Sequence, residues 1–519
     1  MMPGTPCIPR FIDPQTGFTV DVRGMDLAAQ ALESLAGVED APLVQAHAEM
    51  QRLEAGAIKN PDENRKVTHF SDRQGYCDSG VFADVEAFAA GVRDGRVTVN
   101  GNRVTAVVIN GIGGSALGPQ LMQRAVNGPY WNELEAPGAP RIYFLDNTDP
   151  AGIHDLKQVV DFAGTLVVSI SKSGGTQETR NNMVALAAEF ADRGLSFPEH
   201  AVAVTMQGSK LDRQAREEGW LKIFPMAESI GGRTSETNIV GHVPAALTGV
   251  DFRAFVEGAR HMDDLTRVGS LAGNPAYQLA ASWYISGNGR GDRNMVIVPY
   301  ADRLVLLGKY LQQLVMESLG KERDLDGNVV HQGLTVYGNK GGTDAHAYIQ
   351  QLNDGRDDFF AVFIEPLRDA ETLEVGDGRT MGDALHAFKS GLVRALRSKQ
   401  RKVIQITIDA VDAANLGMLI ALFERAVAVY AELININAFH QPGVQAYKEA
   451  SKGVDALFHA LTEWLGEQET WSGTAAEVAD ALGEPDQAEE VETILRRLAR
   501  NDRGVHVEWR ESAWHFCSV

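Results

Sequence analysis

The chain has 519 residues, of which 44% are hydrophobic and 23% charged, as is typical of a globular protein with more than one domain. Its formal net charge of −21 excludes general binding to nucleic acid or to anionic membranes, which repel an acidic surface. A small anionic substrate is not excluded, because a local group of hydrogen-bond donors can bind it whatever the total charge.

The cysteines and the N-terminus indicate the compartment. Cys7, Cys77 and Cys517 are far apart and show neither paired nor metal-ligand spacing, which favours a reducing cytosol. The N-terminal "MMPGTPCIPRF" has no charged segment before an apolar run, and no stretch approaches about 18 consecutive apolar residues. We therefore expect a cytoplasmic protein that is neither exported nor membrane-spanning.

Along the chain, the hydrophobic pattern predicts a helical region followed by two α/β domains. Residues 1–95 show mainly helical periodicity, as in "ADVEAFAAGVRDG". Short β-rich runs then alternate with helices: first "VTAVVIN", "RIYFLDN", "TLVVSIS" and "AVAVTM", and later "NMVIVPY", "GLTVYG", "DFFAVFIEPL" and "RKVIQITID". This alternation is typical of parallel sheets with crossover helices. We expect two doubly wound domains, at 96–285 and 286–465, the latter including the C-terminal helices.

The segment 466–519 has a different pattern. Thr474 and Glu477 are spaced as a capping box and Gly483 as a helix stop; a second amphipathic helix and a hairpin over "GVHVEWRESAWHFCSV" follow. We interpret this segment as a small winged-helix-like appendage. Residues 472–519 carry 10 Asp and Glu against 5 Arg and no Lys, so a packing or regulatory role is favoured over DNA binding.

One strand of the first set runs into a loop of small hydrogen-bond donors. In "SISKSGGTQET", Ser171, Lys172 and Ser173 precede two glycines, and a helix is predicted from about Thr176. Hydroxyls and free backbone N–H groups at a helix start suit a phosphate, and glycines let the backbone approach it. By itself this loop is equally consistent with a capped helix after a tight turn.

A second loop, in "VVINGIGGSALGPQ", strengthens the phosphate interpretation. Gly114 and Ser115 open the helix that follows another strand of the same sheet. The glycines lack the G-x-G-x-x-G spacing of a dinucleotide site. Loops at the carboxyl ends of parallel strands meet in one crevice, so two hydroxyl-bearing loops there suit a sugar phosphate better than a nucleotide.

These loops resemble those of the phosphoglucose isomerase family, which has the sugar-isomerase (SIS) fold. Three further segments resemble family signatures in the expected order: "SIGGRTSETNIVG", "MESLGK" and "FHQPGVQAYK". The resemblance implies the reversible isomerisation of glucose 6-phosphate and fructose 6-phosphate, in glycolysis and gluconeogenesis, through a cis-enediol(ate). It also implies that no cofactor or metal is required, and a homodimer in which one subunit's histidine completes the neighbour's site.

Aldose–ketose isomerisation requires a base, a cation near the enediolate oxygen and an acid that opens the sugar ring. Glu317 lies on a predicted helix with Gln313 one turn earlier on the same face, and the resemblance makes Glu317 the base. Arg233 follows two glycines that permit close approach and would be the cation. Without the resemblance, a surface glutamate and an interdomain ion pair remain the simpler interpretations.

Ring opening is assigned from the resemblance to a histidine and a lysine. His346, His331 and His440 are rival histidines, and the family's spacing of about thirty residues after the glutamate selects His346. Lys448 lies seven residues after Gln441, so a helix beginning at Pro442 would place both on one face. The expected substrate-binding residues are Gly114, Ser115, Ser171, Lys172, Ser173, Thr176, Gln313 and Gln441.

Three departures from the family pattern and two alternative functions stay open. The chain reads "GNKGGTDAH" before the histidine, and Gln445 replaces a glutamate near Lys448. The charge of Glu236 would partly neutralise Arg233. One alternative is another SIS-fold enzyme, acting on mannose 6-phosphate or an amino sugar phosphate. The other is a non-catalytic sugar-phosphate sensor, which the joint presence of Glu317, His346 and Lys448 disfavours.

Overall fold

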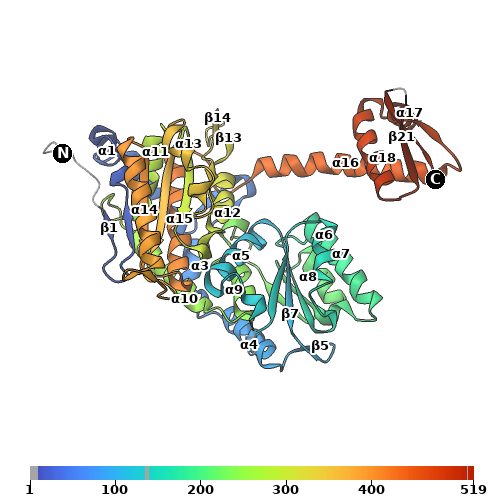
Figure 1. Ribbon diagram of the computed structural model, residues 1–519, viewed down its shortest axis with the longest axis horizontal. Coiled ribbons are helices and arrows are strands. Elements are labelled where there is room, and N and C mark those ends of the chain that lie inside the picture. The colour runs from blue at the N-terminus through green and yellow to red at the C-terminus, as the bar shows by residue number, and fades with distance from the viewer. Residues whose placement is uncertain (1–9, 135–138, 511) are drawn as a thin grey trace. The chain divides into compact units, whose positions relative to one another are not determined.

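The computed structural model describes residues 10–134, 139–510 and 512–519 (Figure 1). Cys7 lies outside the described residues. The chain divides into two compact units, one ending at His440 and one running from Gln441 to Val519. The second unit therefore begins before residue 466, and the boundaries expected inside the first unit stay predictions.

A five-stranded parallel sheet forms the first half of the first unit, in the order β11-β10-β9-β7-β8. Its strands are β7 (Ala106–Asn110), β8 (Arg141–Leu145), β9 (Thr165–Ile170), β10 (Ala201–Thr205) and β11 (Lys222–Pro225). The first four confirm the predicted strands. The sequence analysis missed β11, since it is short and carries a lysine and a proline at its ends.

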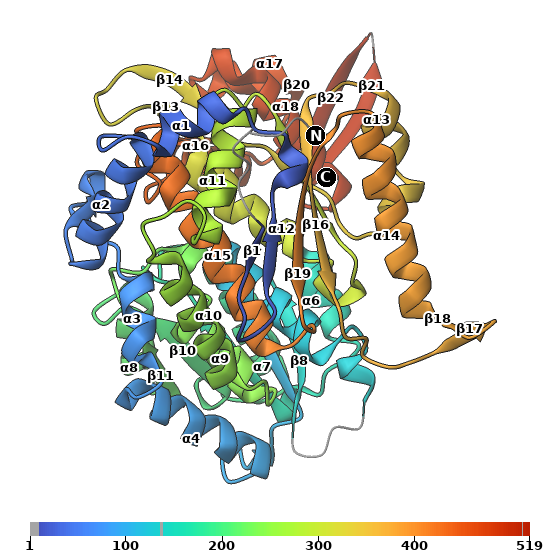
Figure 2. The same ribbon diagram turned by 90° about the vertical axis from the view of Figure 1, so that its left-hand side faces the viewer.

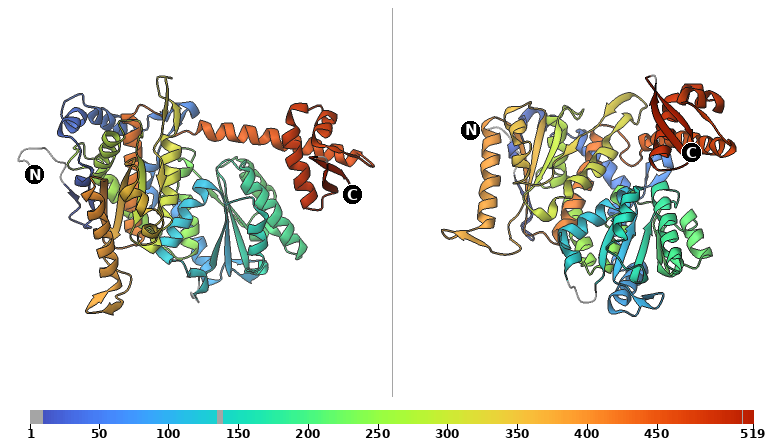
Figure 3. Two further views of the ribbon diagram at one scale, coloured as in Figure 1. Left: turned by 45° about the horizontal axis from the view of Figure 1, so that its top comes forward. Right: turned by 45° about the vertical axis from the view of Figure 1, so that its right-hand side comes forward.

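Helices cover both faces of this sheet, as a doubly wound fold requires (Figure 3). One face packs against α4 (Gly80–Asp94) and α9 (Ile239–Leu247). The opposite face packs against α6 (Pro150–Leu156), α7 (Gln177–Asp192) and α8 (Lys210–Glu217). Burial on both sides explains why β7, β9 and β10 are apolar almost throughout.

The second sheet of the first unit has the order β1-β2-β19-β16-β12-β15. Its parallel strands are β12 (Asn294–Pro299), β15 (Val336–Tyr337), β16 (Phe359–Pro366) and β19 (Lys402–Ile408). One face packs on α10 (Phe252–Thr266), α11 (Pro275–Ser286), α12 (Leu307–Leu311) and α15 (Ala413–Leu433), and the other on α13 (Ile349–Asp354) and α14 (Met381–Ser398). The α/β fold class with two doubly wound sheets is confirmed.

The N-terminal region is not helical throughout. It contains α1 (Ala29–Ala36), α2 (Pro42–Glu54) and α3 (His69–Tyr76) before α4, as expected. However, β1 (Phe11–Ile12) and β2 (Thr19–Asp21) extend the second sheet, and β2 pairs antiparallel with β19 (Figure 2). Short hairpins follow at β3 (Ile58–Asn60) with β4 (Arg65–Lys66), and at β5 (Thr98–Val99) with β6 (Asn102–Arg103). Strands of two or three residues are too short to show the alternation of apolar and polar residues by which a strand is predicted.

Two small antiparallel pairs also belong to the first unit. They are β13 (Lys321–Arg323) with β14 (Val329–Gln332), and β17 (Glu374–Gly376) with β18 (Arg379–Thr380). The second pair lies directly before α14 in the chain, and its residues are largely exposed (Figure 2).

The second unit has a hydrophobic core of its own. It contains α16 (Pro442–Glu467), α17 (Ala475–Leu482), α18 (Ala488–Arg500) and the sheet β20-β22-β21 (Ser472–Thr474, Ala513–Ser518, Val505–Arg510). Thr474 and Glu477 form the predicted capping box, and Gly483 ends α17 in the left-handed conformation. The predicted helices and hairpin are thus confirmed, and the likeness to a winged helix stays a prediction. No helix among the described residues is long and apolar enough to cross a membrane.

Candidate functional site

The two glycine-rich loops follow neighbouring strands. Asn110, the last residue of β7, is in register with Ser169 of β9, so both loops leave the same edge of the first sheet. The loop after β7 forms a short 3-10 helix at Gly113–Ser115. The two loops therefore begin at neighbouring strand ends, as the sequence analysis expected from the parallel strand order.

The Ser171 loop is preorganised by its own hydroxyls. The Ser171 side chain accepts a hydrogen bond from the Gly174 N–H (3.2 Å) and donates to Thr176 Oγ1 (3.4 Å). Ser173 Oγ accepts the Gly175 N–H at 3.1 Å. Thr176 is the residue before the first turn of α7, with no side-chain capping bond. Three hydroxyls thus lie in the loop that leads into the start of α7, which suits a phosphate.

Lys172 has a different environment from the hydroxyls beside it. Its Nζ donates to the carbonyl oxygens of Glu228 and Ile230, the latter at 2.8 Å. Those carbonyls belong to the loop that leads to Arg233. The structure thus directs the Lys172 amine to a neighbouring loop of the protein.

Arg233 and Glu317 form an ion pair between the two halves of the first unit. Arg233 Nη1 lies 3.2 Å from Glu317 Oε2, and Gln313 Nε2 donates to the same oxygen at 3.2 Å. Glu317 ends a π-helical turn that continues α12, and Gln313 lies on the same face, as predicted. The geometry brings together Arg233, Gln313 and Glu317, three of the predicted residues.

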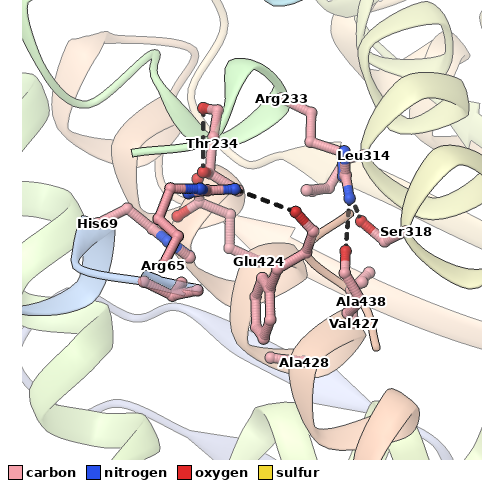
Figure 4. A pocket seen from close by; sticks show the side chains of 13 residues that line it. Arg65, His69, Arg233, Thr234, Leu314, Ser318, Glu424, Val427, Ala428 and Ala438 are labelled. Atoms are coloured by element: carbon pink, nitrogen blue, oxygen red, sulfur yellow. Dashed lines mark hydrogen bonds between the residues drawn. The ribbon is translucent and has the colours of Figure 1, made fainter. Parts of the chain in front are cut away.

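The guanidinium of Arg233 is buried, and backbone carbonyls replace its water. Its Nε donates to Ser318 Oγ at 2.7 Å, and its Nη2 donates to the carbonyl of Ala438 (Figure 4). The same Nη2 also donates to the carbonyl of His440. Burial lowers the pKa of Arg233 below its ordinary value, and Glu317 acts in the opposite direction. The neighbouring Glu317 carboxylate favours the charged form of the guanidinium.

Lys321 is a part of the site that the sequence analysis missed. Its Nζ donates to the carbonyls of Glu317 (2.8 Å) and Ser318 (2.7 Å), so it holds the end of the turn that carries the glutamate. Burial lowers the pKa of Lys321 to about 7. Lys321 is the last residue of the segment "MESLGK", but nothing in its spacing from Ser318 indicated a role of its own in the site.

Glycines allow the loops around Arg233 to touch through their backbones. A Cβ on Gly114 would lie 1.9 Å from the carbonyl oxygen of Gly232, and a Cβ on Gly113 would lie 3.1 Å from Nε2 of Gln313. A side chain at Gly114 would therefore force the Ser115 loop away from the loop of Arg233.

The expected effect of Glu236 on Arg233 is wrong. Glu236 is buried, and neither of its carboxyl oxygens has a hydrogen-bond partner among the described residues. Burial, with a smaller effect of Glu424, raises the pKa of Glu236 well above its usual range, so the neutral acid is favoured. Glu236 therefore brings no compensating charge to Arg233, which pairs with Glu317 instead.

Residues 27–464 match the family model of phosphoglucose isomerase. The chain belongs to the phosphoglucose isomerase family. The glucose-6-phosphate isomerase of Nostoc sp. is 48% identical over 476 residues, which cover 89% of this chain and 88% of the relative. That of Citrifermentans bemidjiense is 46% identical over 517 residues, covering 97% and 96%. The crystal structure of a glucose-6-phosphate isomerase from Chlamydia trachomatis has a TM-score of 0.75 at 27% identity and covers 85% of this chain and 89% of that one.

No hydrogen bond or ion pair described in the structure joins His346 to Glu317. His346 is exposed, at the end of a short 3-10 helix whose first residue, Asp344, is buried. Lys448 is an exposed residue of α16 in the second unit, and Gln441 immediately precedes that helix, which begins at Pro442 as predicted. Among the described residues, no group of three or more His, Cys, Asp or Glu is arranged to hold a metal ion.

We expect Gly114→Ala to lower kcat/KM for sugar phosphate by at least about 10²-fold, because the new methyl group separates the Ser115 and Arg233 loops. Steady-state kinetics would measure this loss. Gly75→Ala, in α3, is the control, since a Cβ there meets no atom within 4 Å. Equal activity of Gly114→Ala and wild type would contradict the close loop contact.

Glu236 should make folding stability depend on pH. Its folded pKa is raised, so the stability it contributes is complete below the unfolded pKa of about 4.5 and decreases as pH rises toward the folded value. In urea unfolding, the free energy of unfolding of Glu236→Gln should rise relative to that of wild type as pH increases above the unfolded pKa, by up to about 1.4 kcal/mol per pH unit. The exposed Glu257→Gln should show no such trend. A pH-independent difference for Glu236→Gln would mean that this carboxyl is ionised in the folded protein.

Proposed function

We propose that the chain interconverts glucose 6-phosphate and fructose 6-phosphate at the group formed by Arg233, Gln313 and Glu317. The observation that carries this proposal is the position of the Glu317 carboxylate, within 3.2 Å of both a buried guanidinium and an amide. Membership of the phosphoglucose isomerase family, with relatives matched over nearly their whole length, defines the enzyme as an aldose–ketose isomerase.

The phosphate would bind at the edge of the first sheet. Ser115, Ser171, Ser173 and Thr176 offer hydroxyls there, and the glycines between them expose backbone N–H groups. The Gly113–Gln313 and Gly114–Gly232 approaches bring this edge against Glu317 and Arg233. A six-carbon sugar phosphate bound in this way would place its first two carbons away from the phosphate and near the carboxylate.

Glu317 would carry out the proton transfer. Starting from the open-chain aldose, its carboxylate takes the proton from C2, and the C1 carbonyl oxygen becomes the enediolate oxygen. The proton of the C2 hydroxyl then moves to O1, and the carboxylic acid returns the first proton to C1 as the C2 carbonyl forms. Arg233 would stabilise the negative oxygen of the cis-enediolate by charge and hydrogen bonding. Its carbonyl partners leave the guanidinium positively charged, which this role requires.

Ring opening is proposed for His346 and Lys448. The exposure of His346 is consistent with its donation to the site of a second copy of the chain. Several apolar side chains near β17 and α14 are also exposed, and a second copy would cover them: Leu373 (46%), Val375 (52%), Met381 (57%) and Phe388 (65%). We therefore propose a homodimer with shared active sites, acting in glycolysis and gluconeogenesis in the cytoplasm.

Glu317→Gln tests the catalytic role. Glutamine keeps the size of the side chain but cannot accept the proton, so turnover should fall by at least about 10²–10⁴-fold while a sugar-phosphate analogue binds within about tenfold of wild type. In D₂O, wild-type enzyme should incorporate deuterium at C2 of glucose 6-phosphate, and the variant should not.

The exposed Glu322→Gln is the matched control and should behave as wild type. Near-normal turnover of Glu317→Gln would locate the base elsewhere. Analogue binding without any turnover by the wild type would favour the sensor alternative.

Phe388→Glu tests the homodimer. A charged side chain among the exposed apolar residues near β17 and α14 should make their burial against a second copy unfavourable. Light scattering after size exclusion should therefore show a shift from dimer to monomer. Activity should be lost as well if the two copies share their sites. Val184→Glu, at a similarly exposed apolar position on α7, should leave the mass unchanged. A monomeric wild type, or a dimer unaffected by Phe388→Glu, would contradict this interface.

A further inference from the structure

The loop immediately before Arg233 is held by two cations from distant segments of the chain. Lys172 Nζ, in the phosphate loop, donates to the carbonyls of Glu228 and Ile230. Arg65 Nη1, on β4 of the N-terminal region, donates to the carbonyl of Ser229 at 3.2 Å. Three consecutive carbonyls of this 228–230 loop thus accept hydrogen bonds from charged donors, which are stronger than neutral ones.

Arg65 also contacts the second segment that surrounds Arg233. Its Nη2 donates to the carbonyl of Phe439 at 3.2 Å, between the two residues whose carbonyls accept from Arg233 (Figure 4). Next to it, the Thr68 N–H donates to the Ser229 carbonyl, and the Thr68 hydroxyl donates to Ser229 Oγ at 2.7 Å. The N-terminal region therefore fixes the 228–230 loop from one side, and Lys172 fixes it from the phosphate loop.

The ammonium of Lys172 is well suited to this role. Burial, with a further effect of Arg65, lowers the pKa of Lys172 to about 8, so the group remains protonated at neutral pH. Its two carbonyl partners fall within one short loop. To bind phosphate directly, the amine would have to leave these carbonyls. That of Ile230 belongs to a buried residue, and a buried carbonyl without a partner is unfavourable.

We propose that Lys172 is a positioning residue for Arg233, which ties the phosphate loop to the loop of the catalytic arginine, and that Arg65 holds the same loop from the N-terminal region. This inference rests on the proposed function of Arg233. It differs from the expectation that Lys172 contacts the phosphate, and the two roles have different kinetic signatures. A phosphate contact is shared by ground and transition states and mainly affects KM, whereas a displaced Arg233 harms the transition state and lowers kcat.

The experiment compares Lys172→Met with Arg65→Met in the full-length protein. Both remove a charged donor to the 228–230 loop, but only Lys172 belongs to the phosphate loop. We expect both to lower kcat by about 10- to 100-fold, with KM for fructose 6-phosphate and inhibition by inorganic phosphate changed by less than about threefold. Hydrogen exchange of peptides covering 228–233 should become faster in both variants.

Lys402→Met is the matched control. Its Nζ also donates to a backbone carbonyl, that of Met25 at 2.9 Å, but it lies on β19 of the second sheet. This variant should retain wild-type kcat and wild-type exchange at 228–233. The control thereby shows whether an effect comes from losing a lysine–carbonyl bond in general or from losing the bonds of Lys172 to the 228–230 loop.

Two results would overturn the inference. A tenfold or larger rise in KM and in the phosphate inhibition constant for Lys172→Met, with Arg65→Met unaffected, would make Lys172 a phosphate ligand. Unchanged kcat and unchanged exchange in both variants would show that the loop needs neither cation. If Lys172→Met does not fold, Arg65→Met still tests whether the loop controls kcat. Absence of isomerase activity in the wild type would instead reject the proposed function, while the exchange measurement still tests the loop contacts.

Discussion

The ion pair between Arg233 and Glu317 is the interaction on which the rest of the site depends. The arginine follows β11, the last strand of the first sheet, and the glutamate ends the helical turn that follows β12 of the second sheet. The pair therefore forms only when both α/β halves of the first unit are folded and lie side by side. The backbone approach of Gly114 to Gly232 sets how closely the phosphate loop can lie to this pair.

Backbone carbonyls are the common partners of the buried cations in this region. Arg233 donates to the carbonyls of Ala438 and His440, Lys321 to those of Glu317 and Ser318, and Lys172 to those of the 228–230 loop. Carbonyl dipoles stabilise a cation without cancelling its charge, unlike a second carboxylate. The charges of Lys172 and Lys321 are thus stabilised by dipoles and not by carboxylates. Likewise, the neutral form favoured for buried Glu236 brings no compensating charge to Arg233.

Much of the fold and part of the site could be predicted from sequence, because both rest on local patterns. Continuous apolar runs predicted β7 and β9 correctly, and the spacing of Gln313 and Glu317 placed them on one helix face. Strands β1 and β2 were missed, because two or three residues have no measurable period and form a strand only by pairing with an existing edge. The role of Lys321 was missed for a related reason: its partners are carbonyls, which every residue has.

By itself, the sequence determined which residue types were present and which local elements carried them: hydroxyls and glycines after two strands, a glutamate at the end of a helix, an arginine after two glycines. These follow from side-chain chemistry and from the periods of helices and strands, which act over a few residues. Only the tertiary structure decided that Glu236 is buried and most stable as the neutral acid, and that the Lys172 amine faces the loop before Arg233. Burial and hydrogen-bond partners depend on segments far apart in the chain, and no local pattern specifies which distant carbonyl a given cation will reach.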